Sequence, residues 1–129
     1  MQQVGVIGMA VMGKNLALNI KHQGFSVAVY SVNKDEVDAV ADHYADDQLM
    51  ATYSWAEFVH SLERPRKIIL MIKAGSPVDE TIARLKPLLS PGDIIIDGGN
   101  SLFKDTNRRF HDLKAIKIRY LGLGVSGGE

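Results

Sequence analysis

Short runs rich in valine and isoleucine recur along the chain and alternate with segments of helical periodicity. The runs occupy residues 4–7, 27–30, 68–72, 94–96 and 118–121. Nearly unbroken apolar runs are typical of strands that are buried on both faces of a parallel sheet. Helical patterns lie between them at residues 12–23, 34–44, 54–62, 78–88 and 102–114. This alternation predicts an α/β domain with a Rossmann-type, doubly wound, mainly parallel sheet and helices on both faces.

The turn after the first run has the spacing of the G-x-G-x-x-G dinucleotide fingerprint, with Gly8, Ala10 and Gly13 at the three small positions. The first glycine permits a tight turn, the alanine lets a pyrophosphate approach the backbone, and the last glycine lets the next helix pack on the strand. A diphosphate would accept hydrogen bonds from N–H groups at the positive helix end. We expect cofactor binding here; a plain glycine turn is the alternative. Met9 and Met12 pack either beside the cofactor or in the core.

Small or polar residues also follow the other predicted strands. They occupy residues 31–34, 73–75, 97–101 and 125–129. In open α/β sheets, ligands bind in the crevice beyond the carboxyl ends of the strands. We therefore expect these segments and the first turn to share one site.

The residues after the second run bear on the choice of cofactor. NAD sites usually carry Asp or Glu there for the ribose 2′-hydroxyl, whereas NADP sites carry Arg for the 2′-phosphate. Ser31, Val32, Asn33 and Lys34 include neither an acid to repel a phosphate nor an arginine fork to grip it. Ser31 and Asn33 can donate hydrogen bonds, and Lys34 can supply charge. Alternatively, Asn33 caps the next helix and Lys34 is solvated.

Composition narrows the class of protein. The 129 residues suffice for one domain, and 15 basic residues balance 15 acidic ones, so bulk charge points to neither nucleic acid nor an anionic membrane. Cysteine is absent, and no apolar run approaches the ~20 residues of a membrane span. We expect a soluble cytoplasmic domain that binds neither nucleic acid nor membrane.

Several charged residues are not interpreted as site residues. The histidines lack metal-ligand spacing, so no metal site is expected; they are His22, His43, His60 and His111. Asp35, Glu36 and Asp38 are interpreted as a solvated helix face. A solvated face is also the interpretation of Arg108 and Arg109, although both could reach a phosphate.

The chain closes on a glycine-rich loop at residues 124–129, directly after the last predicted strand. No helical pattern follows to cover that end of the sheet. We expect residues 1–129 to be a single dinucleotide-binding domain, the N-terminal fragment of a longer chain whose helical domain is missing. A complete five-stranded domain is the alternative.

Four sequence blocks resemble 6-phosphogluconate dehydrogenase. They are Gly-Met-Ala-Val-Met-Gly-Lys-Asn-Leu-Ala-Leu-Asn (8–19), Ile-Ile-Leu-Met-Ile-Lys-Ala-Gly (68–75), Asp-Ile-Ile-Ile-Asp-Gly-Gly-Asn-Ser (93–101) and Gly-Val-Ser-Gly-Gly-Glu (124–129). Asp105-Thr106 and Arg108-Arg109 follow the third block as they do in the family. Sister β-hydroxyacid dehydrogenases share the first block, whereas the other three point to this member.

The resemblance implies an NADP-dependent oxidoreductase of the pentose phosphate pathway and of gluconate utilisation. That family oxidises and decarboxylates 6-phosphogluconate to ribulose 5-phosphate and CO2. The cofactor residues it implies are Gly8, Met9, Ala10, Val11, Met12 and Gly13 at the diphosphate, Ser31, Val32, Asn33 and Lys34 at the adenosine ribose, and Ile72, Lys73, Ala74 and Asn100. Asn100 would lie between nicotinamide and sugar, and Ser126, Gly127 and Gly128 would bind the substrate.

Two departures from the family pattern qualify these expectations. The usual Asn-Arg-Ser/Thr after the second strand is Ser31-Val32-Asn33 here, so NADP is expected with NAD as an alternative, because Val32 replaces the arginine. The family's catalytic lysine and glutamate lie beyond residue 129, as does the helical domain that forms its homodimer. General acid–base catalysis needs those groups. The chain is therefore expected to bind cofactor without turnover. The alternatives are a 3-hydroxyisobutyrate-type β-hydroxyacid dehydrogenase and a non-catalytic nucleotide-sensing module.

Overall fold

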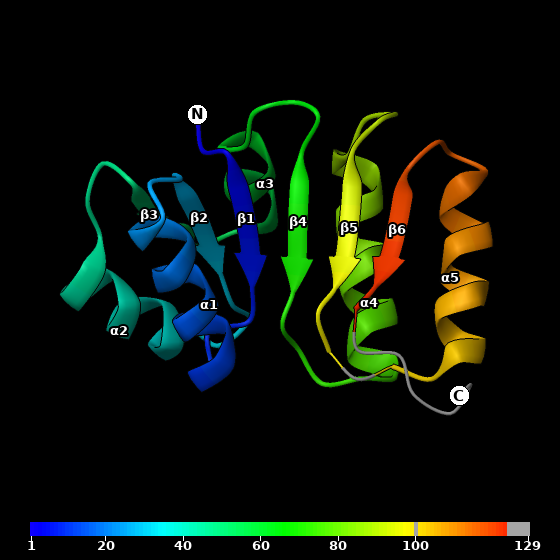
Figure 1. Cartoon of the computed structure of the whole chain (residues 1–129), viewed down its shortest axis with the longest axis horizontal. Helices are drawn as coiled ribbons and strands as arrows, with labels where there is room; N and C mark the ends of the chain where they lie inside the picture. Colours follow the sequence, from blue (N-terminus) through cyan, green and yellow to red (C-terminus); the bar gives the residue numbers. More distant parts are fainter. Residues whose placement is uncertain (100, 124–129) are drawn as a thin grey trace.

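The computed structural model describes residues 1–99 and 101–123. Six strands in this part of the chain form one parallel sheet in the order β3-β2-β1-β4-β5-β6 (Figure 1). They are β1 (Val4–Ile7), β2 (Val27–Tyr30), β3 (Leu49–Ala51), β4 (Lys67–Leu70), β5 (Ile94–Asp97) and β6 (Arg119–Gly122). Chain order runs outward in both directions from the β1–β4 pair, which is the switch point of a doubly wound sheet.

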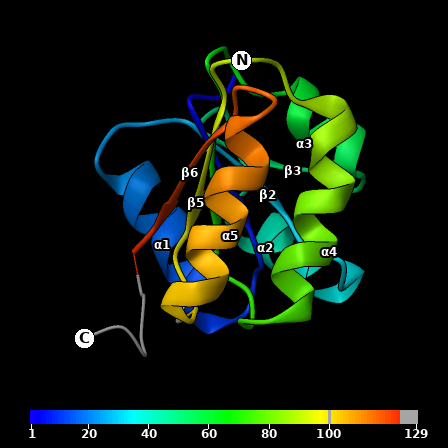
Figure 2. The same cartoon turned by 90° about the vertical axis from the view of Figure 1, so that its right-hand side faces the viewer.

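Helices lie on both faces of this sheet. They are α1 (Val11–His22), α2 (Lys34–Tyr44), α3 (Trp55–His60), α4 (Ser76–Leu85), which continues into a 3-10 turn at Lys86–Leu88, and α5 (Phe103–Lys114). Helices α1 and α2 pack on one face, and α3, α4 and α5 pack on the other. Figure 2 shows α4 and α5 on the opposite side of the sheet from α1.

Among the described helices, none is long and apolar enough to cross a bilayer.

The core lies in two layers because successive strand side chains point to opposite faces. Val6 of β1 packs in one cluster with Ala17 of α1 and Val40 of α2. The next residue, Ile7, packs in the other cluster with residues of α3, α4 and α5, among them Phe58. Both faces of the central strands are therefore buried, as the unbroken apolar runs predicted.

The predicted α/β architecture is confirmed, but the expected number of five strands was wrong. Strands β1, β2, β4, β5 and β6 lie on the predicted runs, with ends shifted by at most two residues. The missed strand, β3, has only three residues and follows the acidic pair Asp46 and Asp47. Among the described strands its one neighbour is β2, at the sheet edge. So short an edge strand has too few residues to show a periodicity.

Helix α1 starts in close contact with the turn that follows β1. Gly8 has a φ of +102°, a backbone conformation that favours glycine. A Cβ added to Gly13 would collide with the carbonyl oxygen of Gly8, and one added to Gly8 would collide with the carbonyl oxygen of Met71. The small residues of the fingerprint thus let α1 begin directly above the switch point between β1 and β4.

We predict that Gly13→Ala lowers the free energy of unfolding by about 3 kcal/mol, because the new methyl group meets backbone that cannot rotate away. The matched control is Gly92→Ala. Gly92 has a φ of +97° and open space around the position of a Cβ, so this variant should cost only about 1 kcal/mol of backbone strain. Urea unfolding followed by circular dichroism measures both, and equal losses would contradict the proposed close contact.

Candidate functional site

A cleft of about 540 Å³ opens at the carboxyl ends of β1, β2 and β4. Three loops reach it: Gly8 and Ala10 line it from the β1–α1 turn, Ser31, Val32 and Asn33 from the β2–α2 loop, and Ile72 and Lys73 from the β4–α4 loop. These segments, predicted to share one site, are brought together by the parallel sheet. All three lie at the lower edge of the sheet in Figure 1, to which the strand arrows point.

The first turn of α1 borders this cleft without a capping side chain. Its N-cap, Ala10, makes no side-chain hydrogen bond to the helix, and the first turn holds no acidic residue. The first N–H groups of any α-helix lack partners within the helix and carry the positive end of its dipole. At Ala10, these groups can bind an anion such as a diphosphate.

The other fingerprint residues are placed differently. Met9 is buried in the core cluster of α1 and α2, so the core interpretation holds for this side chain. Val11 and Met12 are exposed, and Gly13 is buried against Gly8. Contacts of these residues with a cofactor stay predictions. At a diphosphate, their backbone N–H groups would make the contacts, and their side chains would not.

The β2–α2 loop is held by its own polar groups. Asn33 caps α2, its Oδ1 accepting a hydrogen bond from the backbone N–H of Asp35 at 3.0 Å. The Lys34 ammonium donates to Asp38 at 2.8 Å and does not line the cleft. That hydrogen bond from Lys34, with a second one from Tyr53, lowers the pKa of the Asp38 carboxyl. The capping interpretation of Asn33 is confirmed; a cofactor contact of Lys34 stays a prediction.

The solvated-face interpretation of Glu36 was wrong. Its Oε1 accepts a hydrogen bond from the Ser31 hydroxyl at 2.8 Å, and the Ser31 oxygen accepts one from the Asn33 N–H at 3.1 Å. Glu36 is half-buried and lines the cleft. The sequence did carry a signal: a helix N-cap Asn followed three residues later by Glu has capping-box spacing, which turns the glutamate back toward the preceding loop.

Sequence reasoning also missed the far wall of the cleft. Trp55 at the start of α3 lines it, as do Glu80, Thr81 and Arg84 of α4. The Trp55 ring lies 4.7 Å from the ring of Tyr30, between centroids. No local pattern signals this wall, because it forms only when α3 and α4 pack on the same face of the sheet.

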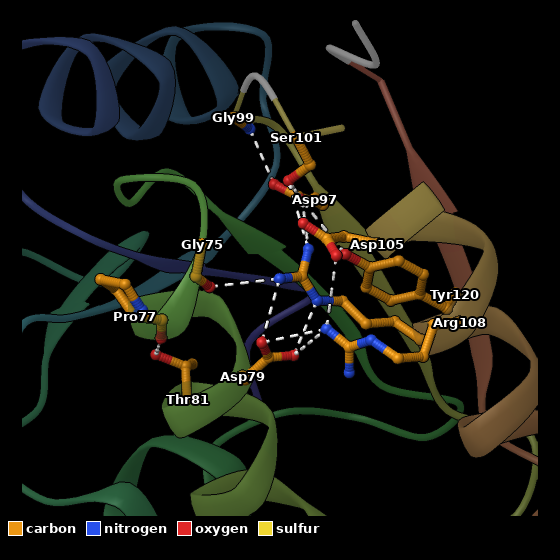
Figure 3. A network of polar contacts seen from close by, with 11 residues as sticks. Gly75, Pro77, Asp79, Thr81, Asp97, Gly99, Ser101, Asp105, Arg108 and Tyr120 are labelled. Carbon is orange, nitrogen blue, oxygen red and sulfur yellow. Dashed lines mark hydrogen bonds and ion pairs between the residues drawn. The ribbon is translucent and has the colours of Figure 1, made fainter. Parts of the chain in front are cut away.

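The loop after β5 is fixed by a buried carboxylate (Figure 3). Asp97 is fully buried and accepts hydrogen bonds from the Ser101 hydroxyl, from the Gly99 N–H at 2.9 Å and from the Tyr120 hydroxyl at 3.0 Å. Burial and the Asp97 charge raise the pKa of the Tyr120 hydroxyl. Of the predicted contacts further along, Asn100 lies outside the described residues, as do Ser126, Gly127 and Gly128. Their roles stay predictions.

Arg109 connects this carboxylate to α4, so its interpretation as part of a solvated face was also wrong. Its side chain is 2% exposed, with Nη1 3.9 Å from Asp97 and Nε donating to Asp79 at 2.8 Å. Nη2 donates to the carbonyl of Gly75 at 3.1 Å, in the β4–α4 loop next to Ala74. The hydrogen bond from Arg109 lowers the pKa of the Asp79 carboxyl. Arg108 is half-exposed, as expected of a surface residue, and also pairs with Asp79.

We predict that Arg109→Gln lowers the free energy of unfolding by about 3 kcal/mol, because it leaves the buried Asp97 carboxylate without its cation. Arg108→Gln is the matched control, since this neighbouring arginine binds the same Asp79 at the surface and should contribute less than about 1 kcal/mol. Urea unfolding measures both variants. A loss for Arg109→Gln no larger than that for Arg108→Gln would show that the buried pairing is not required.

Among the described residues, no three His, Cys, Asp or Glu side chains gather as metal ligands. The polar groups of the cleft are instead a free helix N-terminus, hydroxyl and amide side chains, and charges of both signs. Such a site suits an extended, partly anionic organic ligand better than a metal ion.

Comparisons with known proteins agree with this geometry. Residues 3–129 match the family model of the NAD binding domain of 6-phosphogluconate dehydrogenase. The decarboxylating 6-phosphogluconate dehydrogenase of Synechococcus elongatus is 55% identical over 100% of this chain, which corresponds to 28% of that protein. Two enzymes of this name from Bacillus subtilis, one NADP(+)-dependent and one NAD(+)-dependent, are 53% and 52% identical over 99% and 98% of the chain, each time 27% of the relative.

A solved structure gives the same result for the fold. The 6-phosphogluconate dehydrogenase of Plasmodium falciparum superposes with a TM-score of 0.80 at 36% identity, covering 92% of this chain and 26% of that one. The chain thus spans little more than a quarter of the length of these relatives. With a family model matched over residues 3–129 and a cleft at the switch point of the sheet, the chain belongs to the 6-phosphogluconate dehydrogenase family and carries its NAD-binding domain.

Proposed function

We propose that the cleft binds a nicotinamide adenine dinucleotide, NADP or NAD, with its diphosphate at the first turn of α1. The observation that carries this proposal is the uncapped helix N-terminus at Ala10, held above the switch point by the contact of Gly13 with Gly8. Diphosphate groups bind at such positions because several N–H groups and the helix dipole act on one anion.

The adenosine half would lie toward β2 and the nicotinamide half toward β4 and β5. On the adenosine side, Ser31, Val32 and Asn33 would meet the ribose, and the Trp55 ring offers an apolar surface to the base. On the nicotinamide side, Ile72, Lys73 and Ala74 follow β4. The predicted position of Asn100 in the β5 loop would put it between nicotinamide and substrate.

We further propose that the longer protein oxidises 6-phosphogluconate at its 3-hydroxyl with NADP or NAD and releases CO2, giving ribulose 5-phosphate. The names of the relatives support this reaction: the similar enzymes from Synechococcus elongatus and Bacillus subtilis are decarboxylating 6-phosphogluconate dehydrogenases. Substrate contacts by Ser126, Gly127 and Gly128, a catalytic lysine and glutamate beyond residue 129, and a homodimer are parts of this proposal.

Within this reaction, the described residues have a binding role. In this proposal they hold the nicotinamide at the carboxyl edge of the sheet, and the buried Asp97, paired with Arg109, holds Gly99 and Ser101. Orientation of this kind contributes to rate by holding the reacting groups in position before reaction.

The diphosphate position is tested by Ala10→Asp. Aspartate is a favoured N-cap residue and should keep α1 at least as stable, but its carboxylate would occupy the anion position. We expect affinity for NAD and NADP to fall at least about tenfold. Binding can be followed through Trp55, the only tryptophan of the chain.

Ala10→Ser is the matched control, because serine caps the helix without a charge. It should bind both dinucleotides within about threefold of the original affinity, a difference of under ~1 kcal/mol. Undiminished binding by Ala10→Asp would place the diphosphate elsewhere and contradict the proposal.

The reaction itself is tested by a chimera in which this chain replaces the matching part of the Synechococcus elongatus enzyme. That part is 55% identical to the whole of this chain. The chimera should reduce cofactor and release CO2 from 6-phosphogluconate in equal amounts, whereas the 129-residue chain alone should release none. A chimera that is folded and binds both ligands but forms no CO2 would overturn the proposed role of this domain.

A further inference from the structure

The carboxyl group of Glu36 lies where the adenosine ribose of a bound dinucleotide would meet the end of β2. We infer that Glu36 selects NAD over NADP, by accepting a hydrogen bond from the ribose 2′-hydroxyl and repelling a 2′-phosphate. This inference rests on the proposed binding of a dinucleotide in the cleft and names which of the two cofactors is taken.

The position of the carboxylate is fixed from two sides. Glu36 is the third residue of α2, whose start is set by the Asn33 cap. The Ser31 hydroxyl donates to its Oε1 at 2.8 Å, and Ser31 itself is only 7% exposed. Among the hydrogen bonds of the described residues, Oε2 takes no partner, so the Glu36 side chain, which lines the cleft, keeps an acceptor oxygen for a ligand.

An acidic side chain at this place has a defined consequence in dinucleotide sites. A carboxylate at the end of the second strand accepts from the ribose hydroxyls of NAD, whereas NADP sites place arginine near the 2′-phosphate. Here the carboxylate comes from the first turn of α2 and reaches back to Ser31, instead of belonging to the strand end itself. Its Oε1 nevertheless accepts a hydrogen bond from Ser31, the residue that directly follows β2.

Among the described residues, the lining of the cleft holds no cation on the β2 side, and Lys14 of α1 lines a neighbouring hollow that Glu36 shares with the acidic Asp35. Lys34 pairs with Asp38 at 2.8 Å and does not line the cleft, and the exposed residue Val32 is apolar. Lys73 belongs to the loop after β4. Arg84 lies on α4 across the cleft, and Glu80, one helical turn before it, lines the same wall. That wall therefore adds one charge of each sign.

A 2′-phosphate carries close to two negative charges at neutral pH, so a carboxylate beside it repels it strongly in a partly desolvated cleft. The 2′-hydroxyl of NAD has no such cost and gains a hydrogen bond to an ionised acceptor. Overall similarity does not decide the matter, because relatives named for either cofactor are almost equally similar to this chain.

The test compares NAD with NADP, and 5′-ADP with 2′,5′-ADP, by isothermal titration calorimetry on the unaltered chain. We expect the ligand without the 2′-phosphate to bind at least about tenfold more tightly in each pair. Glu36→Gln keeps an acceptor for Ser31 but removes the charge, and it should shift the NAD:NADP affinity ratio toward NADP by about tenfold. Glu36→Lys should shift the ratio further.

Asp35→Asn is the matched control, since it removes one negative charge from the adjacent, exposed residue, which does not line this cleft. It should leave the ratio within about twofold. Preference of the unaltered chain for NADP or 2′,5′-ADP would overturn the inference without any variant. So would an unchanged ratio in both folded Glu36 variants. Equal binding of both dinucleotides would leave the proposed function standing and remove the inference, whereas binding of neither would remove both.

Discussion

The absence of a side chain at Gly13 is the constraint on which the cleft depends. Because no Cβ separates α1 from the Gly8 carbonyl, the helix starts close to the end of β1, and its N-cap Ala10 borders the cleft. A larger residue would push the helix away from the sheet and would turn this end from the crevice. The same contact therefore sets two things. It sets how α1 packs on the sheet, through core residues such as Ala17, and where the proposed diphosphate position lies.

A second constraint holds residues of the loops after β4 and β5. Burying a carboxylate such as Asp97 is unfavourable unless other groups replace the hydrogen bonds and counter-charge that water would provide. Here a backbone N–H, two hydroxyls and the Arg109 guanidinium do so, and they come from the β5 loop, from β6 and from α5. Arg109 also binds Gly75 in the β4–α4 loop, so the loops after β4 and β5 are held by one group. Electrostatic contacts thus set the positions of these residues, whereas a steric contact sets the start of α1.

The sequence predicted the parts of this arrangement that rest on local pattern. Apolar runs located five strands, and glycine spacing located the turn that binds the diphosphate in our proposal. The same reasoning failed where a residue's role depends on partners far along the chain. Leu49 is fully buried although β3 is too short to show a period, and Arg109 is buried beside an exposed arginine on a helix rich in charge. Nothing in the adjacent pair Arg108-Arg109 tells which one meets a buried carboxylate, because the order of β5 and β6 in the sheet decides it.

Glu36 shows why cofactor choice is harder to read than the fold. The core residues of β2 cannot change without a cost in packing, whereas Val32 is 79% exposed and Glu36 is half-buried at a helix start. Substitution at such positions would alter the charge that a bound ribose meets, while leaving the sheet and the first turn of α1 intact. Relatives of nearly equal identity can therefore differ in cofactor, as the two Bacillus names indicate. In our inference, the charge that decides between the cofactors lies on Glu36, beyond the segment 31–34 that directly follows β2, and the Asn33 cap and the Ser31 hydroxyl hold it beside the cleft.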